Sequence, residues 1–373
     1  MVNTTTDLEP GGPPAPAGAG GPGPARGRRQ LARIRGEGWG DVLFVPAVLL
    51  ALVVYLSLAN EFFLTSINVT NIFIQASILA IVAFGLTFVI IAGELDLSVG
   101  SGVALVSVIA AMVMRDSGSM LLGILAGIGL GLGIGLVNGL IVTRLEVPSF
   151  IATLGMLTIA HGVALALTDG AVVSGVPVGL GDLVNEGLLG IRWVLWLVLV
   201  VFAALYFLQN QTVFGARVFA VGGNREASRL SAIPVDRIRL LTFVISGITV
   251  GIAGIVLTAR VQSGQPNAGG LLALTAIAAI VVGGTNLLGG RGSITRTLWG
   301  VLLISVLENG LQLEGVNDDL RQVIIGAVFI AAASVEFFRR QMRRRGRAIP
   351  VAAGPAGAPP EPSAEPAPAP EHR

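Results

Sequence analysis

The sequence contains no cysteine and no lysine, and its only histidines are His161 and His372. Without cysteine the chain can form neither a disulfide nor a thiolate metal site, and two histidines are too few for a histidine-based metal cluster. A Walker A phosphate loop needs Gly-Lys-Ser/Thr, so the chain is not a standard P-loop ATPase. We therefore predict that it is not an enzyme and has no cofactor, and that any dependence on ATP comes from a separate protein.

Charged residues are also scarce, at 12% of the 373 residues, and the mean hydropathy is +0.81. A soluble chain would have about a quarter of its residues charged. Apolar runs close to the length of a membrane span recur along the chain, and they predict an all-α, polytopic membrane protein of about ten transmembrane helices. The expected helices are residues 42–59, 69–92, 97–114, 120–143, 149–167, 192–208, 239–260, 271–288, 294–312 and 321–338. The fifth and the eighth carry Thr, Gly or His, which leaves a short or broken helix open as an alternative at these two segments.

The two ends differ from the rest in composition. Residues 1–40 are predicted to be a disordered Pro/Gly-rich tail with a basic end, and residues 341–373 a basic and then Pro/Ala-rich disordered tail. The membrane domain is expected at residues 41–340. Because the first apolar run begins near Val42, too late for a cleavable signal peptide, we interpret it as an uncleaved span.

Arginine placement predicts the orientation of these spans. With ten spans and a cytoplasmic N-terminus, four of the 24 arginines fall outside and the other twenty fall inside. The four are Arg115, Arg192, Arg260 and Arg321. Such an asymmetry follows the positive-inside rule, so both termini are predicted to be cytoplasmic.

The fourth expected helix is rich in glycine. Gly123, Gly127, Gly131 and Gly135 recur at four-residue spacing, which lets helix backbones approach closely in lipid. Asn138 follows on the same helix. It can make an interhelical hydrogen bond or line a cavity.

A polar loop of about residues 210–238 separates the sixth and seventh spans, and it is too long for a simple helix connection. Asn224 can cap a short helix that ends before Pro234. The apolar stripe of this helix consists of Ala227, Leu230 and Ile233. The residues alone leave two interpretations open, a docking element for another protein or an interfacial helix lying on the membrane.

Five ordered motifs identify a family. They are GELDLSVGS, EVPSFIATLGMLTIAHGVAL, GARVFAVGGNREASRLSAIPVDRIRLL, SGQPNAG and GGTNLLGGRGS. Together, over about residues 40–340, they resemble the permease subunits of bacterial ribose/xylose-type monosaccharide ABC importers. The resemblance implies a multi-pass protein of the bacterial plasma membrane that carries a sugar and binds no nucleic acid.

The partners that the resemblance implies are a second permease chain, in a homodimer or a heterodimer, two cytoplasmic ATPase domains and an extracytoplasmic sugar-binding protein. The segment Gly222–Ser231 matches the loop that contacts the ATPase in this family, which favours the docking interpretation. The residues of this coupling loop are Gly222, Gly223, Asn224, Glu226, Ala227, Arg229, Leu230 and Ser231.

The chain departs from the family pattern at three places. The family's first motif usually reads Gly-Gly-Ile-Asp, but its second Gly is Glu94 here. The usual Glu-Leu-Asp-Ala-Ile-Ala-Ala is replaced by residues 273–279 without either acid, and the usual Asn-Asn-Gly begins with Glu308. A nucleoside or a sugar-like signal is therefore an alternative cargo. An ion-driven secondary transporter, with Glu308 or Asp96 as proton carrier, is the rival class.

Two glycine-rich breaks interrupt the apolar sequence at the expected inner ends of the second and eighth spans. Asp96, followed by Ser98, can cap the next helix. The acids of this break can alternatively pair with an arginine such as Arg291 or Arg144 in an inner gate, or contact the solute directly. The residues assigned to the breaks and the inner gate are Gly93, Asp96, Ser98, Gly100, Gly283, Gly284, Gly289, Gly290 and Arg291.

Glu308 lies near the middle of an apolar segment, where an ionised carboxylate must be paired, protonated or hydrated. It can line the pore or a subunit interface, or make a structural hydrogen bond. Neutral amides suit a sugar, which offers hydroxyl donors and acceptors. The candidate translocation path is Gln75, Asn138, Glu308 and Asn309. His161 is interpreted as a helix-packing residue.

Overall fold

The computed structural model describes residues 39–317, 319–328, 330–331 and 334. Residues 1–38 of the first predicted tail, the whole of the second, and part of the tenth expected helix lie outside these residues. The long helices are α2 (Trp39–Ala59), α3 (Ser66–Ile91), α4 (Val99–Ser117), α5 (Met120–Arg144), α6 (Ser149–Thr168), α8 (Trp193–Gln211), α11 (Val235–Val261) and α13 (Ile294–Leu313). The short elements are η1 (Val178–Gly181), α7 (Asp182–Asn185), β1 (Gly187–Leu188), β2 (Ile191–Arg192), α9 (Val213–Gly223), α10 (Arg225–Leu230) and α12 (Leu272–Val282). Strands β1 and β2 form an antiparallel hairpin in which Gly187 pairs with Arg192.

Six of the described helices are long and apolar enough to cross a membrane, namely α3, α4, α5, α6, α8 and α11. The all-α membrane class predicted from the sequence is therefore confirmed. Shorter apolar helices are found at residues 43–59, 213–223 and 272–282, and residues 319–328 are also helical.

The fifth expected helix, α6, runs without a break from Ser149 to Thr168, close to its predicted bounds of 149–167. The eighth, predicted to reach residue 288, stops at Val282 because Gly283 and Gly284 follow, and Gly284 has a φ of 85° that glycine adopts readily. Residues 262–271, before α12, are largely non-helical and pass beside α4, where Gly264 lies against Ser107.

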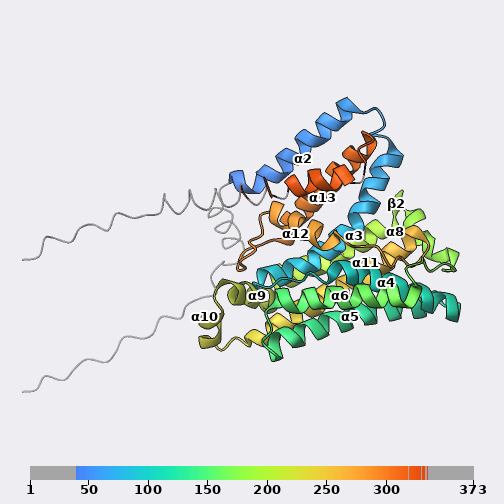
Figure 1. Cartoon of the computed structure of the whole chain (residues 1–373). Coiled ribbons are helices and arrows are strands. Elements are labelled where there is room, and N and C mark those ends of the chain that lie inside the picture. Colours follow the sequence, from blue (N-terminus) through green and yellow to red (C-terminus); the bar gives the residue numbers. More distant parts are fainter. Residues whose placement is uncertain (1–38, 318, 329, 332–333, 335–373) are drawn as a thin grey trace, which may run out of the picture.

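Helix α3 forms the centre of the protein, and its side chains from Ile81 to Ile91 are inaccessible to solvent. Figure 1 shows α4, α5, α6 and α11 side by side, α2 and α13 together beyond α3, and α9 and α10 at one end of the bundle. The membrane domain therefore ends, on that side, in the segment predicted to be the coupling loop.

Helices α5 and α11 pack closely against each other along their glycines. A Cβ added at Gly131 would overlap the carbonyl oxygen of Gly247 and lie 2.6 Å from the backbone nitrogen of Gly251. Gly127 and Gly135 meet the same helix, at Ile255 and at the backbone of Phe243. The glycine face predicted for this helix is confirmed, because its glycines let the two backbones come together.

Replacing Gly131 by alanine should lower the free energy of unfolding by about 2 kcal/mol or more, because backbone atoms on α11 cannot move aside as a side chain can. The matched control is Gly133→Ala on the same helix, where the new methyl group would meet nothing within 4 Å. That variant should be as stable as the parent or more stable, since alanine favours a helix over glycine by about 1 kcal/mol. Thermal unfolding of both purified variants in detergent measures the difference, and equal midpoints would show that the α5–α11 contact is looser than described.

Candidate functional site

Glycines from three distant segments meet at the end of the bundle that carries α9 and α10. Gly93 follows α3, Gly222 and Gly223 end α9, and Gly289 and Gly290 follow α12. We call these five residues the glycine junction. A Cβ at Gly222 would overlap the carbonyl oxygen of Ile91, and one at Gly290 would lie 2.8 Å from Gly223 Cα. The coupling loop and both predicted breaks therefore touch one another backbone to backbone.

The turns at this junction require glycine for a second reason. Gly93, Gly289 and Gly290 have φ angles of 79°, 85° and 72°, in the left-handed region that side chains disfavour. The Gly290 amide also donates a hydrogen bond to the carbonyl oxygen of Ile91 at 2.8 Å. The second break is thus tied directly to the last turn of α3.

Glu94 is the acidic group at the junction, and its side chain is only 4% exposed. Its Oε1 accepts a hydrogen bond from Arg225 Nη2 at 2.5 Å and another from Arg239 Nε at 2.6 Å. Arg225 Nη2 also donates to the carbonyl oxygen of Gly93 at 3.0 Å. The carboxylate therefore joins the first break to the start of α10 and to the first turns of α11.

One alternative from the sequence has an acid of this break paired with an arginine such as Arg291 or Arg144, and the structure pairs Glu94 with two other arginines. Among the described residues, no ion pair links Glu94 or Asp96 to Arg144 or Arg291. Arg225 and Arg239 pair with Glu94 instead, because the fold brings the end of α9, where α10 begins, and the start of α11 against the break.

Asp96, two residues further on, is also buried, but its partners are neutral. Its Oδ1 accepts hydrogen bonds from the amide and the hydroxyl of Ser98 at 3.0 and 2.6 Å, and its Oδ2 accepts one from Ser246 Oγ on α11 at 3.0 Å. Asn138 Nδ2 on α5 donates to Ser98 Oγ at 2.8 Å. These hydrogen-bonded side chains hold the break against α5 and α11.

The predicted cap of α4 takes a different form. Ser98 occupies the N-cap position, but its side chain makes no capping hydrogen bond, and Asp96 accepts from Ser98 rather than from the first turn of α4. Asn138 makes the interhelical hydrogen bond that was one of its two interpretations. In the part of the chain that the structure describes, its Oδ1 has no hydrogen-bond partner.

Helix α10 starts as the sequence predicts. Asn224 Oδ1 accepts a hydrogen bond from the amide of Ala227 at 3.0 Å, which is the capping interaction expected of this residue. Ser228 faces inward and is buried, whereas Ala227 is exposed and Leu230 is 82% exposed. Two residues of the predicted apolar stripe, Ala227 and Leu230, therefore point away from the bundle, whereas the third, Ile233, lies beyond the end of α10 and packs against the core.

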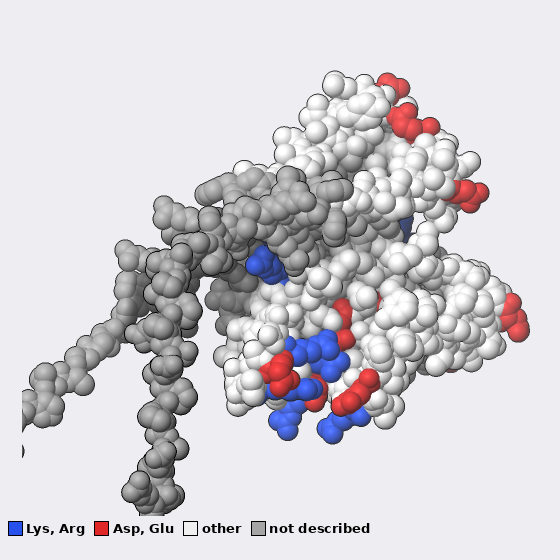
Figure 2. All heavy atoms as spheres, turned by 60° about the vertical axis from the view of Figure 1, so that its left-hand side comes forward, with Lys and Arg blue, Asp and Glu red and all other residues white. Residues whose placement is uncertain are grey.

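Charge gathers on the same end of the molecule. Figure 2 shows arginines mixed with acidic residues on this face, whereas the surface around them is largely uncharged. Arg229 Nη2 lies 3.9 Å from Asp236 Oδ1, and Arg239 Nη1 lies 3.5 Å from the same oxygen. The Arg229–Asp236 pair connects α10 to the start of α11 a second time, and the Arg239–Asp236 pair lies within α11.

The candidate path residues do not form one hydrogen-bonded group within the described ranges. Asn309 on α13 pairs reciprocally with Asn68 on α3, with N–O distances of 2.8 and 3.0 Å. Glu308 is partly buried in the last two turns of α13, near enough to Arg321 for an electrostatic interaction. Gln75 is partly buried on α3, and Asn138 belongs to the Asp96 network instead.

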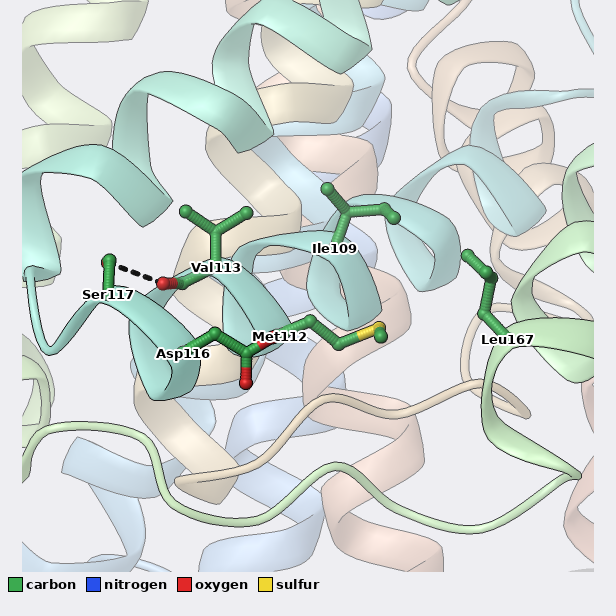
Figure 3. A pocket seen from close by; sticks show the side chains of 6 residues that line it. All are labelled: Ile109, Met112, Val113, Asp116, Ser117 and Leu167. Carbon is green, nitrogen blue, oxygen red and sulfur yellow. Dashed lines mark hydrogen bonds between the residues drawn. The ribbon is translucent and has the colours of Figure 1, made fainter.

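An open cavity lies elsewhere, between α4 and α6. It has a volume of about 490 Å³ and is mainly apolar (Figure 3). Its lining residues are Ile109, Met112, Val113, Asp116, Ser117 and Leu167. None of the predicted site residues lines it.

His161, on α6, is exposed rather than packed between helices, contrary to its interpretation from the sequence.

Sequence reasoning missed the residues that complete the site, which are Asn68, Arg225, Arg239 and Ser246. Only Arg225 carried a local signal, because it directly follows the capping residue Asn224 within the coupling loop. The others lie on helices far along the chain from their partners, and only the folded chain brings them together.

The fold is a helical membrane domain with a capped helix projecting from one end, which is compatible with a transport permease subunit but does not define one. The profile of the family described as branched-chain amino acid transport system / permease component matches residues 68–333, and the chain belongs to this family.

The chain is 41% identical over 290 residues to the ribose import permease protein RbsC of Bacillus subtilis, which covers 77% of this chain and 90% of that protein. It is 38% identical to RbsC of Escherichia coli K12 over 297 residues, 77% of this chain and 91% of that protein. It is 35% identical to the L-arabinose ABC transporter permease protein AraH of Azospirillum brasilense over 315 residues, 84% and 93% of the two chains. No solved structure matches significantly. The resemblance to ribose-type permeases is thereby confirmed.

Proposed function

We propose that the chain is the membrane-spanning permease subunit of an ATP-driven ABC importer and forms the path for a monosaccharide delivered by an extracytoplasmic binding protein. The single observation that carries this proposal is the match to ribose and arabinose permeases along nearly the whole membrane domain. A pentose is the favoured cargo for the same reason. The nucleoside and the sugar-like signal remain the alternatives within this class.

The proposed topology has ten spans with both termini in the cytoplasm of a bacterial cell, and the protein lies in the plasma membrane. Beside the six long apolar helices, four further segments supply the remaining spans. They are α2, α12 with the non-helical segment before it, α13, and the helix that begins at residue 319. The non-helical segment at membrane depth is acceptable because it is packed against α4 rather than exposed to lipid.

The coupling loop is proposed to dock on one of two cytoplasmic ATPase domains, and a second permease chain to complete the pore. Leu230 and Ala227 offer apolar contacts, Asn224 fixes the start of α10, and Glu226 and Arg229 surround them with charge. An exposed apolar side chain with a charged rim is the usual centre of a protein interface. Closure of the two ATPases would then move α10 and, through the glycine junction, both breaks.

Neutral polar side chains are proposed to line the translocation path, because a sugar offers only hydroxyl groups. Asn138 has a carbonyl oxygen free for such a contact, and Gln75 and Glu308 are each partly buried. Asn309 already pairs with Asn68, so its place in the path requires that this pair open during transport.

Proteoliposomes test the proposal directly. The chain is reconstituted with its ATPase and its binding protein, and uptake of D-ribose and L-arabinose is followed with and without internal ATP. We expect uptake of at least one of the two pentoses that requires ATP and both partners. Uptake that needs neither partner would overturn the proposal and favour the ion-driven rival.

A further inference from the structure

The Glu94 carboxylate accepts hydrogen bonds from arginines of two separate segments at the cytoplasmic end of the bundle. Arg225 is the first residue of α10, and Arg239 lies in the second turn of α11. The two guanidinium groups reach the same carboxylate oxygen at 2.5 and 2.6 Å. Charge-assisted hydrogen bonds of this kind are roughly twice as strong as neutral ones.

These contacts fix the orientation of α10 as well as its position. Arg225 holds the first residue of the helix to the break, through Glu94 and the carbonyl oxygen of Gly93. Arg229, one turn later, faces Asp236, which in turn faces Arg239. A helix held at two points one turn apart cannot pivot without breaking an ion pair.

The break between α3 and α4 also connects Glu94 to side chains inside the bundle. Asp96 lies two residues after Glu94 in the same short connection between α3 and α4, and it is hydrogen-bonded to Ser246 on α11 and, through Ser98, to Asn138 on α5. A displacement of Glu94 is therefore transmitted to side chains on two further helices, α5 and α11. The glycine contacts nearby are steric and set how close the segments lie, whereas the carboxylate supplies bonds that resist separation.

We propose that Glu94 is a positioning residue that transmits the movement of α10 to the α3–α4 break, and that this role requires its negative charge. The inference rests on the proposed function, since it assumes that an ATPase moves α10. A neutral side chain at this position would leave the Arg239 guanidinium, only 11% exposed, with no ionic partner except the more distant and exposed carboxylate of Asp236, at 3.5 Å. The coupling loop would then move without moving the break.

The first experiment uses the chain alone. Because the sequence has no cysteine, cysteines placed at Leu230 and Leu288, both strongly exposed, take spin labels at these two positions only. Leu288 lies in the second break, beside Gly93. In nanodiscs, the distance distribution between the labels should be narrow in the parent and broad in Glu94→Gln. Glu61→Gln, at an exposed carboxyl group in the turn before α3, is the matched control and should leave the distribution unchanged.

The second experiment uses the complete importer in proteoliposomes and measures D-ribose taken up per ATP hydrolysed. Glu94→Gln should lower this ratio about tenfold while ATP hydrolysis continues, and Glu61→Gln should keep the parent ratio. A merely structural role would lower the thermal midpoint of Glu94→Gln without changing the ratio of the protein that remains folded. That result, or an unchanged distance distribution, would overturn the inference.

Arg225→Gln keeps the test decisive if Glu94→Gln does not fold, because the Arg225 side chain is 43% exposed and its loss is easier to tolerate. This variant should also broaden the distribution of distances between the two labels. Arg217→Gln, which replaces an exposed arginine on α9, should leave the distribution as narrow as in the parent. Equal widths for the two variants would contradict the inference. A parent importer that transports no pentose would refute the proposed function alone, since the label distances are measured without any partner.

Discussion

Gly222→Ala is expected to abolish both folding of the coupling end and sugar uptake. The added methyl group would overlap the carbonyl oxygen of Ile91 and lie 2.7 Å from the amide nitrogen of Gly290. Both obstacles are backbone atoms in segments tied together by a hydrogen bond, so neither can rotate away. We expect a loss of about 3 kcal/mol in the free energy of unfolding, measured as a lower yield of folded protein and a lower thermal midpoint.

The neighbouring residue provides the control. Gly223 also ends α9, but a Cβ there would meet nothing within 4 Å. Gly223→Ala should therefore give the parent yield and thermal midpoint. If the two variants were equally stable, the contact between α9 and the end of α3 would not be the close backbone contact described.

Leu230→Asp is expected to weaken binding of the ATPase at least tenfold while the permease stays folded. The side chain is 82% exposed and points away from the bundle, so the folded chain loses no packing when it is replaced. Burying a leucine in an interface contributes about 1.5–3 kcal/mol, and a carboxylate in its place must also lose its hydration. Titration of the purified ATPase onto the permease in nanodiscs measures the change.

Leu189→Asp is the matched control for this loss of affinity. Leu189 is 86% exposed, and it lies in the β1–β2 turn at the opposite end of α8 from the coupling loop. Its φ of 56° is one that aspartate tolerates. The control should bind the ATPase as the parent does. Unchanged affinity in Leu230→Asp would remove α10 from the docking surface.

Features set by local sequence could be predicted well. The Asn224 cap depends on residues within three positions of one another, and it is present as predicted. The glycine face of α5 follows from four-residue spacing on one helix, and it packs as expected. Helix α12 ends six residues early because Gly283-Gly284 was included in an apolar run whose hydropathy did not reveal the stop.

Features that depend on segments meeting could not be predicted. Each glycine-rich break was visible in the sequence, yet nothing local indicates that Gly93, Gly222 and Gly289 touch. Glu94 illustrates the same limit, because its partners lie 131 and 145 residues away and several arginines offered the same charge. An acid in an apolar environment predicts that a partner exists, but only the fold selects which one.

Polar residues within helices showed a similar pattern. The sequence places Asn309 among the candidate path residues, and the structure pairs it with Asn68, which no local pattern singles out. Reciprocal amide pairs satisfy two donors and two acceptors at once, so they are favourable wherever two helices bring them together. A polar residue in a span thus correctly indicates that it needs a hydrogen-bond partner, but it indicates the function of that residue only incompletely.

The central claim is that the chain takes its energy from an ATPase docked on α10. Uphill transport by the purified chain alone tests it most directly, in liposomes that carry a proton or sodium gradient and contain no nucleotide. The account predicts no accumulation of D-ribose or L-arabinose under either gradient, and accumulation once ATP, the ATPase and the binding protein are supplied. Concentration of either pentose by the chain alone would contradict it.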